Sequence, residues 1–504
     1  MKRKRLKNNT ISAFIYQLTT IICGFLIPRL ILDYYGSEIN GLVNSITQFL
    51  AMIAFLDLGV GAVFQSSLYK PLADNDVENM SKIFVSGQKF FARLAVILLG
   101  YIVVLICLYP FITDYESDFF FVATLIIAMS ISVFAQYYFG MANGLFLMAD
   151  QRGYISNNIQ TVTLIMNAIA CYVLISIGAS IQIVKFSTSC IYLARPIFLK
   201  IYVDRNYNLN KRIRYEGEPI KQKWNGLAQH IVSVVLDSTD IIVLTVFSSL
   251  SNVSVYSVYY LVIAGIKQII TATTSGLQAL MGELYARGDK KELGTFFAWS
   301  EWIIHTATTF VFGCTSILIL PFVLVYTRGV TDAEYNQPIF SILIVLAYAM
   351  YCYRLPYHII IKAGVHYAQT QRCYIIATIL NILISIFMVK RLGLIGVAIG
   401  TLISMLYQVV WMAWYDCRNL IDWPFANFLK QSVTDLITGV AGYILCSIIN
   451  IQNYTYRSWI VMGFKVATIW LMLICIINYI FYNEMIMKLL KMTKLCFAKT
   501  IKHK

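Results

Sequence analysis

Long apolar segments dominate this sequence of 504 residues. A helix that spans a membrane needs about 20 predominantly apolar residues, and about fourteen segments of the chain meet that requirement. Hydrophobic residues make up 59% of the chain and charged residues only 13%, whereas a soluble domain is about 25% charged. The sequence therefore predicts an all-α polytopic membrane protein. The expected spans are 10–32, 41–65, 83–109, 119–148, 155–177, 181–203, 226–250, 253–281, 302–327, 336–363, 372–392, 394–416, 431–450 and 459–482.

The basic residues indicate how these segments are oriented, because short loops rich in Lys and Arg stay in the cytoplasm. With the amino terminus inside and residues near the end of a span counted with the adjacent side, 30 of the 40 Lys and Arg residues lie on the cytoplasmic side and 4 on the outer side. The other 6 lie deeper within spans. We therefore expect an even number of spans and both termini in the cytoplasm. The net charge of +15 comes mainly from these basic residues on the cytoplasmic side. It therefore does not predict binding to nucleic acid.

Short sequence matches predict that the chain contains two related halves. The pair Leu68-Tyr69 recurs as Leu284-Tyr285, 216 residues later, and Asn167 recurs as Asn381, 214 residues later. Because each half would hold six spans, both would insert in the same orientation and form a parallel pseudo-repeat. The predicted parts are an N-lobe at 1–203, a cytoplasmic linker at 204–225, a C-lobe at 226–416, two further spans at 431–482 and a basic cytoplasmic tail at 483–504.

The sequence offers little that could support catalysis. It has no G-x-x-x-x-G-K-[ST] phosphate-binding loop and no H-E-x-x-H zinc motif. Its 11 cysteines follow no metal-binding spacing, and its short outer loops leave no room for a large acceptor-binding domain. We therefore expect a protein that is not an enzyme, with no catalytic residue, no metal site and no cofactor beyond H⁺ or Na⁺ as a coupling ion.

Ionisable side chains within the spans are candidates for a transport site, because each one costs about 2.5–3.5 kcal/mol to insert. In segment 226–250, Asp237 and Asp240 share one predicted helix face with His230 and Ser233. Two carboxylates this close titrate as a coupled pair, which would suit the binding of H⁺ or Na⁺. The alternative is that both carboxylates form structural ion pairs with cations inside the membrane.

A complementary set of basic side chains lies in other spans. Arg195, Lys267 and Arg354 fall near mid-span, His358 follows Arg354 by one helical turn, and Arg29 lies towards the outer end of the first span. An anionic substrate such as a pyrophosphate needs a cavity lined in this way, because guanidinium groups offer paired hydrogen-bond donors. For Arg29, the alternative is that its head group snorkels to the membrane surface.

Four short segments near the amino terminus carry a resemblance to a known family. They are GFLIPR at 24–29, YGSEINGL at 35–42, LDLGVG at 56–61 and LYKPLA at 68–73. Together they resemble the pattern of the Wzx-type oligosaccharide flippases, which are bacterial polysaccharide transporters. That family belongs to the MOP superfamily, which also contains the multidrug (MATE) exporters and the lipid II flippases.

The resemblance implies a flippase that moves undecaprenyl-pyrophosphate-linked oligosaccharide repeat units across the bacterial inner membrane. Two six-helix lobes would alternate between inward-open and outward-open states. The two carboxylates add the expectation that transport is coupled to an ion gradient through Asp237 and Asp240. The implied partners are the lipid-linked glycan, membrane lipids and a polysaccharide polymerase machinery. Among the candidate cations, only Arg29 lies within the matched segments. The alternative is a MATE-type antiporter of drugs or metabolites, which would show acidic groups without a matching set of buried cations.

Overall fold

The computed structural model describes residues 2–57, 59–113, 119–215, 217, 227–449 and 453–488, and in these ranges it contains helices and no strands. The helices are α1 (Lys2–Ala51), α2 (Val60–Ser67), α3 (Tyr69–Asp74), α4 (Val77–Ile112), α5 (Phe119–Ala135), α6 (Met141–Ala149), α7 (Gly153–Ser176), α8 (Ile181–Asn206), α9 (Leu227–Phe247), α10 (Leu250–Arg287), α11 (Lys290–Tyr326), α12 (Pro338–Tyr353), α13 (Leu355–Ala363), α14 (Tyr367–Leu392), α15 (Leu394–Asn419), α16 (Phe425–Ser447) and α17 (Tyr456–Phe481), with a 3-10 turn at Met52–Asp57 and a π-helical turn at Gln136–Gly140.

This architecture confirms the all-α fold of a multi-pass membrane protein. In the described part of the chain, 10 helical segments are long and apolar enough to cross a membrane. The first of those segments, Arg5–Ala54, covers the first predicted span and part of the second, and the other nine each match one further span. The remaining predicted spans fall on α8, α9 and α16. Every predicted span therefore coincides with helical structure in the ranges that the structure describes.

The chain folds into two compact units. Unit 1 comprises Met1–Ser257 with Gly329–Ala333, and unit 2 comprises Val258–Arg328 with Glu334–Lys504. The division between them falls within α10, and α9 packs against α1 in unit 1. The predicted linker lies partly outside the described residues, at 216 and 218–225. The division into six-helix lobes stays a prediction.

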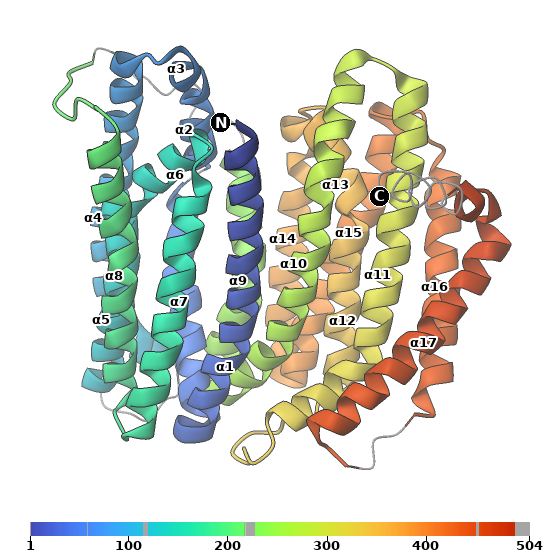
Figure 1. Ribbon diagram of the computed structural model, residues 1–504. Helices are drawn as coiled ribbons and strands as arrows, with labels where there is room; N and C mark the ends of the chain where they lie inside the picture. The colour runs from blue at the N-terminus through green and yellow to red at the C-terminus, as the bar shows by residue number, and fades with distance from the viewer. Residues whose placement is uncertain are drawn as a thin grey trace, which may run out of the picture. The chain divides into compact units, whose positions relative to one another are not determined.

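The long helices of unit 1 pack side by side (Figure 1). In this row α4 contacts α5, α5 contacts α8, α8 contacts α7, and α7 contacts α1. In unit 2, α11 is central to the C-terminal packing, because it contacts α12, α16 and α17. Figure 1 shows α17 running obliquely past α16. Elsewhere in unit 2, α14 and α15 approach closely at Gly400, where an added Cβ would lie 2.3 Å from Ser385 Oγ. Small residues allow this kind of close helix contact in a membrane.

Two of these long helices begin at matching caps. Asp76 accepts a hydrogen bond from Asn79 N–H before α4, and Asp289 accepts one from Glu292 N–H before α11. The hydrogen bonds from Asn79 lower the pKa of the Asp76 carboxyl below its ordinary value. The two caps lie 213 residues apart, from position 76 to position 289, which is close to the offset of the sequence matches.

The first two predicted spans are joined in one helix, α1, which bends at Gly36. Gly36 has φ 84° and ψ 178°, a conformation that essentially only glycine adopts. Beyond the bend, Ser37 donates through its backbone N–H and its hydroxyl to the Asp332 carboxylate, both at 2.6 Å. The Asp332 carboxylate therefore caps the N-terminal end of the second part of α1.

Replacing Gly36 with valine should destabilise unit 1. A Cβ at this position would lie 2.6 Å from Asp332 Oδ2, and the positive φ adds a strain of about 1–3 kcal/mol for a residue other than glycine. Thermal unfolding of the purified protein in detergent measures the effect. Gly100→Val is the matched control, because a Cβ on Gly100 meets nothing within 4 Å. Equal unfolding temperatures for the two variants would contradict the role given to the bend.

Candidate functional site

Two of the predicted cations meet at one aromatic ring in unit 2. Lys267 Nζ on α10 lies 4.3 Å from the centre of the Tyr351 ring, and Arg354 Cζ lies 4.3 Å from the same centre. Lys267 Nζ is also 5.6 Å from the ring centre of Tyr348, one turn earlier on α12. Aromatic faces attract cations at these distances, and more strongly away from water. The structure therefore brings two positive charges together inside an apolar helical unit.

The position of Arg354 follows from a break between two helices. Arg354 is the C-cap of α12 and the N-cap of α13, and Pro356 in the first turn of α13 lacks the N–H that would continue α12. The side chain is only 7% exposed, and it donates to Gln408 Oε1 on α15. Its Nε–H has no hydrogen-bond partner among the described residues. A buried guanidinium with a free donor can bind an anion.

His358 does not join the two cations directly. It lies on α13 one turn after Arg354, but its Nδ1 is 2.5 Å from the hydroxyl of Tyr374 on α14. The two rings also make an edge contact with their centres 6.0 Å apart. The interaction with Tyr374 fixes the orientation of the imidazole and leaves Nε2 as its second polar atom.

The two predicted arginines of unit 1 have other surroundings. Arg29 Nη2 is 2.8 Å from Asp33 Oδ1, one turn later on α1, so that its charge is paired within its own helix. Arg195 on α8 donates from Nε to Thr163 Oγ1 on α7 at 2.7 Å, and its guanidinium stacks over Tyr192 at 3.7 Å. The buried Nη2 of Arg195 has no hydrogen-bond partner among the described residues.

The predicted pair of carboxylates is described for one of its members. Asp240 on α9 is 5% exposed and accepts a hydrogen bond of 2.7 Å from the Tyr256 hydroxyl. Asp237 lies on the same helix, but its side chain is outside the described residues, as are the side chains of His230 and Ser233. The coupling of Asp237 with Asp240 therefore stays a prediction.

Sequence reasoning missed a second group of buried ionisable residues, all in unit 2. They are Glu301 and His305 on α11, Asp416 on α15 and Asp435 on α16, with exposures of 3%, 1%, 0% and 9%. The rule that selects intramembrane charges would have found His305 and Asp435, because both lie inside predicted spans. Glu301 lies one residue before its predicted span and Asp416 at the last residue of its span, where a charge is less informative.

The fold can be compared with known structures. No protein-family model matches the sequence, and a search of curated proteins finds no match. Among solved structures, the fold is similar to a lipid II flippase MurJ in an inward closed conformation, with a TM-score of 0.73 and 15% identity over 95% of this chain and 99% of that chain. It is also similar to an inward-facing MATE-family multidrug transporter, with a TM-score of 0.62 and 14% identity over 81% of this chain and 98% of that chain.

A third structure, a MOP-superfamily transporter from Pyrococcus furiosus with a binding pocket described as reversed in polarity, gives a TM-score of 0.57 and 12% identity over 82% of this chain and 95% of that chain. The chain has the fold of the MOP-superfamily transporters. All three neighbours are flippases or transporters, and the similarity extends over nearly the whole length of each. At these identities the similarity establishes the fold, and the substrate has to be argued from the charges within it.

Proposed function

We propose that the protein is a flippase that moves undecaprenyl-pyrophosphate-linked oligosaccharide repeat units across the bacterial inner membrane for surface polysaccharide biosynthesis. The observation that carries the proposal is the meeting of Lys267 and Arg354 at the Tyr351 ring in unit 2. Similarity to a lipid II flippase over 95% of the chain supports it. The partners would be the lipid-linked glycan, membrane lipids and a polysaccharide polymerase machinery.

The charge of the substrate follows from the electrostatics of these two side chains. A cation inside an apolar unit is costly unless an anion or a dipole compensates it. A pyrophosphate supplies two adjacent negative groups, and a guanidinium can donate two hydrogen bonds to one of them. Two nearby cations would instead repel a positively charged drug. His358, Arg195 and Arg29 are further candidates for contact with the headgroup as the transporter alternates between states.

Binding of the headgroup is the direct test of the anion site. The purified chain, in nanodiscs of neutral lipid, is titrated with an oligosaccharide on a short-chain isoprenyl pyrophosphate and with the same oligosaccharide on the uncharged alcohol. We expect the pyrophosphate compound to bind about tenfold or more tightly, equivalent to about 1.4 kcal/mol. Equal affinity for the two compounds would contradict a pyrophosphate site.

Ion coupling is proposed to use Asp237 and Asp240. Asp240→Asn should remove most of the dependence of transport on a gradient of H⁺ or Na⁺, because the amide can still accept the hydrogen bond from Tyr256 but cannot gain or lose a proton. The flux of lipid-linked oligosaccharide into proteoliposomes is measured with and without each gradient. Asp422→Asn, at an exposed position between α15 and α16, is the control. Full gradient dependence in Asp240→Asn would rule out this role for Asp240.

A MATE-type antiporter remains the second candidate, because the structure also buries carboxylates. Asp240, Glu301 and Asp435 are each less than a tenth exposed, and an organic cation could pair with any of them. The antiporter predicts efflux of a cationic dye in exchange for H⁺ or Na⁺ and no effect of removing Lys267. The flippase predicts no efflux of the dye and a loss of transport when Lys267 is removed.

A further inference from the structure

A His–Asp pair lies between α11 and α16 in unit 2. His305 Nδ1 is 2.7 Å from Asp435 Oδ2, and His305 stacks on the Tyr353 ring with the ring centres 4.7 Å apart. Two further donors reach the other carboxylate oxygen: Thr309 Oγ1 at 2.8 Å and Gln431 Nε2 at 3.1 Å. The Asp435 carboxylate therefore has side-chain partners at both of its oxygens.

The second nitrogen of this imidazole is the unusual feature. His305 is 1% exposed, and its Nε2 has no hydrogen-bond partner among the described residues. With Nδ1–H directed at Asp435, a neutral imidazole leaves Nε2 as a free acceptor, whereas a protonated one forms an ion pair with Asp435. Apolar side chains would pack between these helices without the cost of burying two ionisable groups. The pair is therefore a candidate for a role beyond packing.

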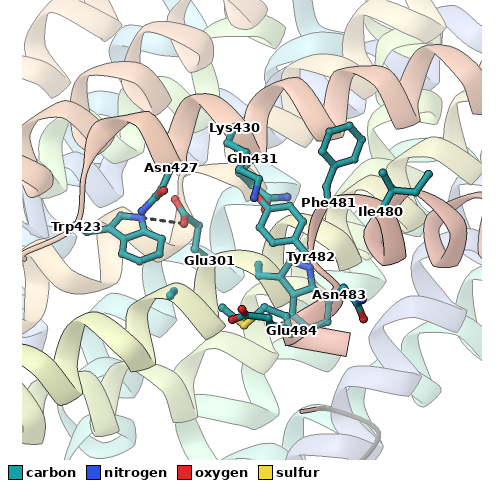
Figure 2. A pocket seen from close by; sticks show the side chains of 13 residues that line it. Glu301, Trp423, Asn427, Lys430, Gln431, Ile480, Phe481, Tyr482, Asn483 and Glu484 are labelled. Atoms are coloured by element: carbon teal, nitrogen blue, oxygen red, sulfur yellow. Dashed lines mark hydrogen bonds between the residues drawn. The ribbon is translucent and has the colours of Figure 1, made fainter. Parts of the chain in front are cut away.

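One cavity of unit 2 is lined by this pair, and a second lies beside Glu301 and Gln431. One, of about 600 Å³, is lined mainly by apolar side chains, with His305, Thr309, Tyr353 and Asp435 among its polar residues. The other, of about 450 Å³, is lined by Glu301, Trp423, Lys430, Gln431 and Tyr482, among others (Figure 2). Gln431 links the two, because it lines the smaller cavity and donates to Asp435.

Glu301 extends the same group of ionisable residues towards the smaller cavity. Its Oε1 accepts from the Tyr357 hydroxyl at 2.5 Å and its Oε2 from Trp423 Nε1 at 3.1 Å, the second of which Figure 2 draws. Glu301 precedes His305 by one turn, and Tyr357 also makes an edge contact with the His305 ring. Among the described residues, the titratable or charged groups around the pair include Glu301 on α11, Tyr353 on α12, Tyr357 on α13, Asp416 and Cys417 on α15, Lys430 and Tyr443 on α16, and Tyr482 and Glu484 after α17.

We propose that His305 and Asp435 form a proton-binding site in the wall of the larger cavity. On loading, Nε2 of the neutral imidazole takes one proton from a hydronium ion, whose O–H bond breaks to leave water, and the imidazolium is held by the ionised Asp435 carboxylate. On release the new N–H bond breaks and the proton passes to a water molecule, which becomes hydronium. Through this site a proton gradient could drive transport from unit 2, and that role rests on the proposed transport function. Proton binding itself does not depend on the proposed function.

The test counts protons rather than transported lipid. The full chain in neutral-lipid nanodiscs, in weak buffer with a pH indicator, is taken from about pH 8 to about pH 5, the range in which histidine gains its charge. We expect His305→Asn to take up about one proton fewer per chain than the wild type. Asp435→Asn should lose most of the same proton, because the imidazolium loses its counter-ion.

The double variant decides whether the proton is shared. His305→Asn with Asp435→Asn should lose no more than His305→Asn alone, since both changes remove one site. His366→Asn is the matched control, because His366 forms its hydrogen bond with Tyr415 and not with Asp435. The decrease in proton uptake caused by His366→Asn should therefore add to the decrease caused by Asp435→Asn. Thr438→Val on α16 controls for packing and should leave uptake unchanged. If His305→Asn does not fold, His305→Gln replaces it.

Three results would overturn the proposal. The first is that His305→Asn takes up as many protons as the wild type. The second is that the decreases in proton uptake of the two single variants add in the double variant. The third is that the proton is released when choline chloride is replaced by sodium chloride, which would make the pair part of a sodium site. None of these measurements needs a transported substrate. A failure of the flippase proposal in vesicles can therefore be told apart from a failure of the proton site.

Discussion

Replacing Lys267 or Arg354 with glutamine should reduce the transport of a pyrophosphate-linked oligosaccharide about tenfold or more in each case. A hydrogen bond to a charged group contributes about 1.5–3 kcal/mol, and both side chains lie at the Tyr351 ring where the pyrophosphate is proposed to bind. Flux into proteoliposomes at low substrate concentration measures the loss. Arg354→Lys should recover only part of it, because lysine keeps the charge but not the planar pair of donors.

The control for this series is Lys465→Gln. Lys465 lies on α17 with an exposed side chain, so that its removal takes the same charge from the chain without touching the Tyr351 site. Its flux should equal that of the wild type. An equal loss in Lys465→Gln and Lys267→Gln would mean that net charge matters and not the position of the cations.

Replacing Trp470 with alanine should have the largest effect on stability, about 3–5 kcal/mol. Trp470 on α17 is 1% exposed. Its ring packs over two glycines, Gly313 on α11 and Gly442 on α16. A Cβ added to Gly313 would lie 2.3 Å from the Trp470 ring, and one added to Gly442 would lie 2.6 Å from it. The ring therefore fills the space where these three helices meet, and truncation leaves a cavity in their shared core with Cys446 and Val466.

Thermal unfolding of the purified protein in detergent tests this role of Trp470. The matched control is Trp414→Ala, because Trp414 on α15 is 43% exposed and its loss opens no cavity of this kind. We expect the unfolding temperature to fall much further for Trp470→Ala than for Trp414→Ala. If the two variants unfold at the same temperature, α17 does not depend on this ring for its packing.

The helices were predictable because each apolar segment carries its own signal. The bend in α1 was not, since Gly36 stands beside Asp332, which lies 295 residues after Ser37 in the sequence and closes the bend only in the folded chain. Apolar patterning predicts where a helix runs, but it contains no information about a distant carboxylate that caps it. The same limit applies to Trp470, whose burial depends on glycines of two other helices.

The candidate site was predictable one residue at a time. Lys267 and Arg354 were found because a charge within a span is unusual, but their meeting at Tyr351 depends on how α10 packs against α12. His305 and Asp435 meet the same criterion, but the sequence does not show that these two side chains face each other across α11 and α16. Their 2.7 Å contact appears only in the structure.

The most direct test of the central claim is a comparison of two substrates in the same proteoliposomes. The reconstituted wild-type chain is supplied with an undecaprenyl-pyrophosphate-linked oligosaccharide and, in a parallel sample, with a cationic dye. The flippase predicts translocation of the lipid-linked oligosaccharide that falls in Lys267→Gln and Arg354→Gln, and no movement of the dye. Movement of the dye without the oligosaccharide would contradict the account and support the antiporter.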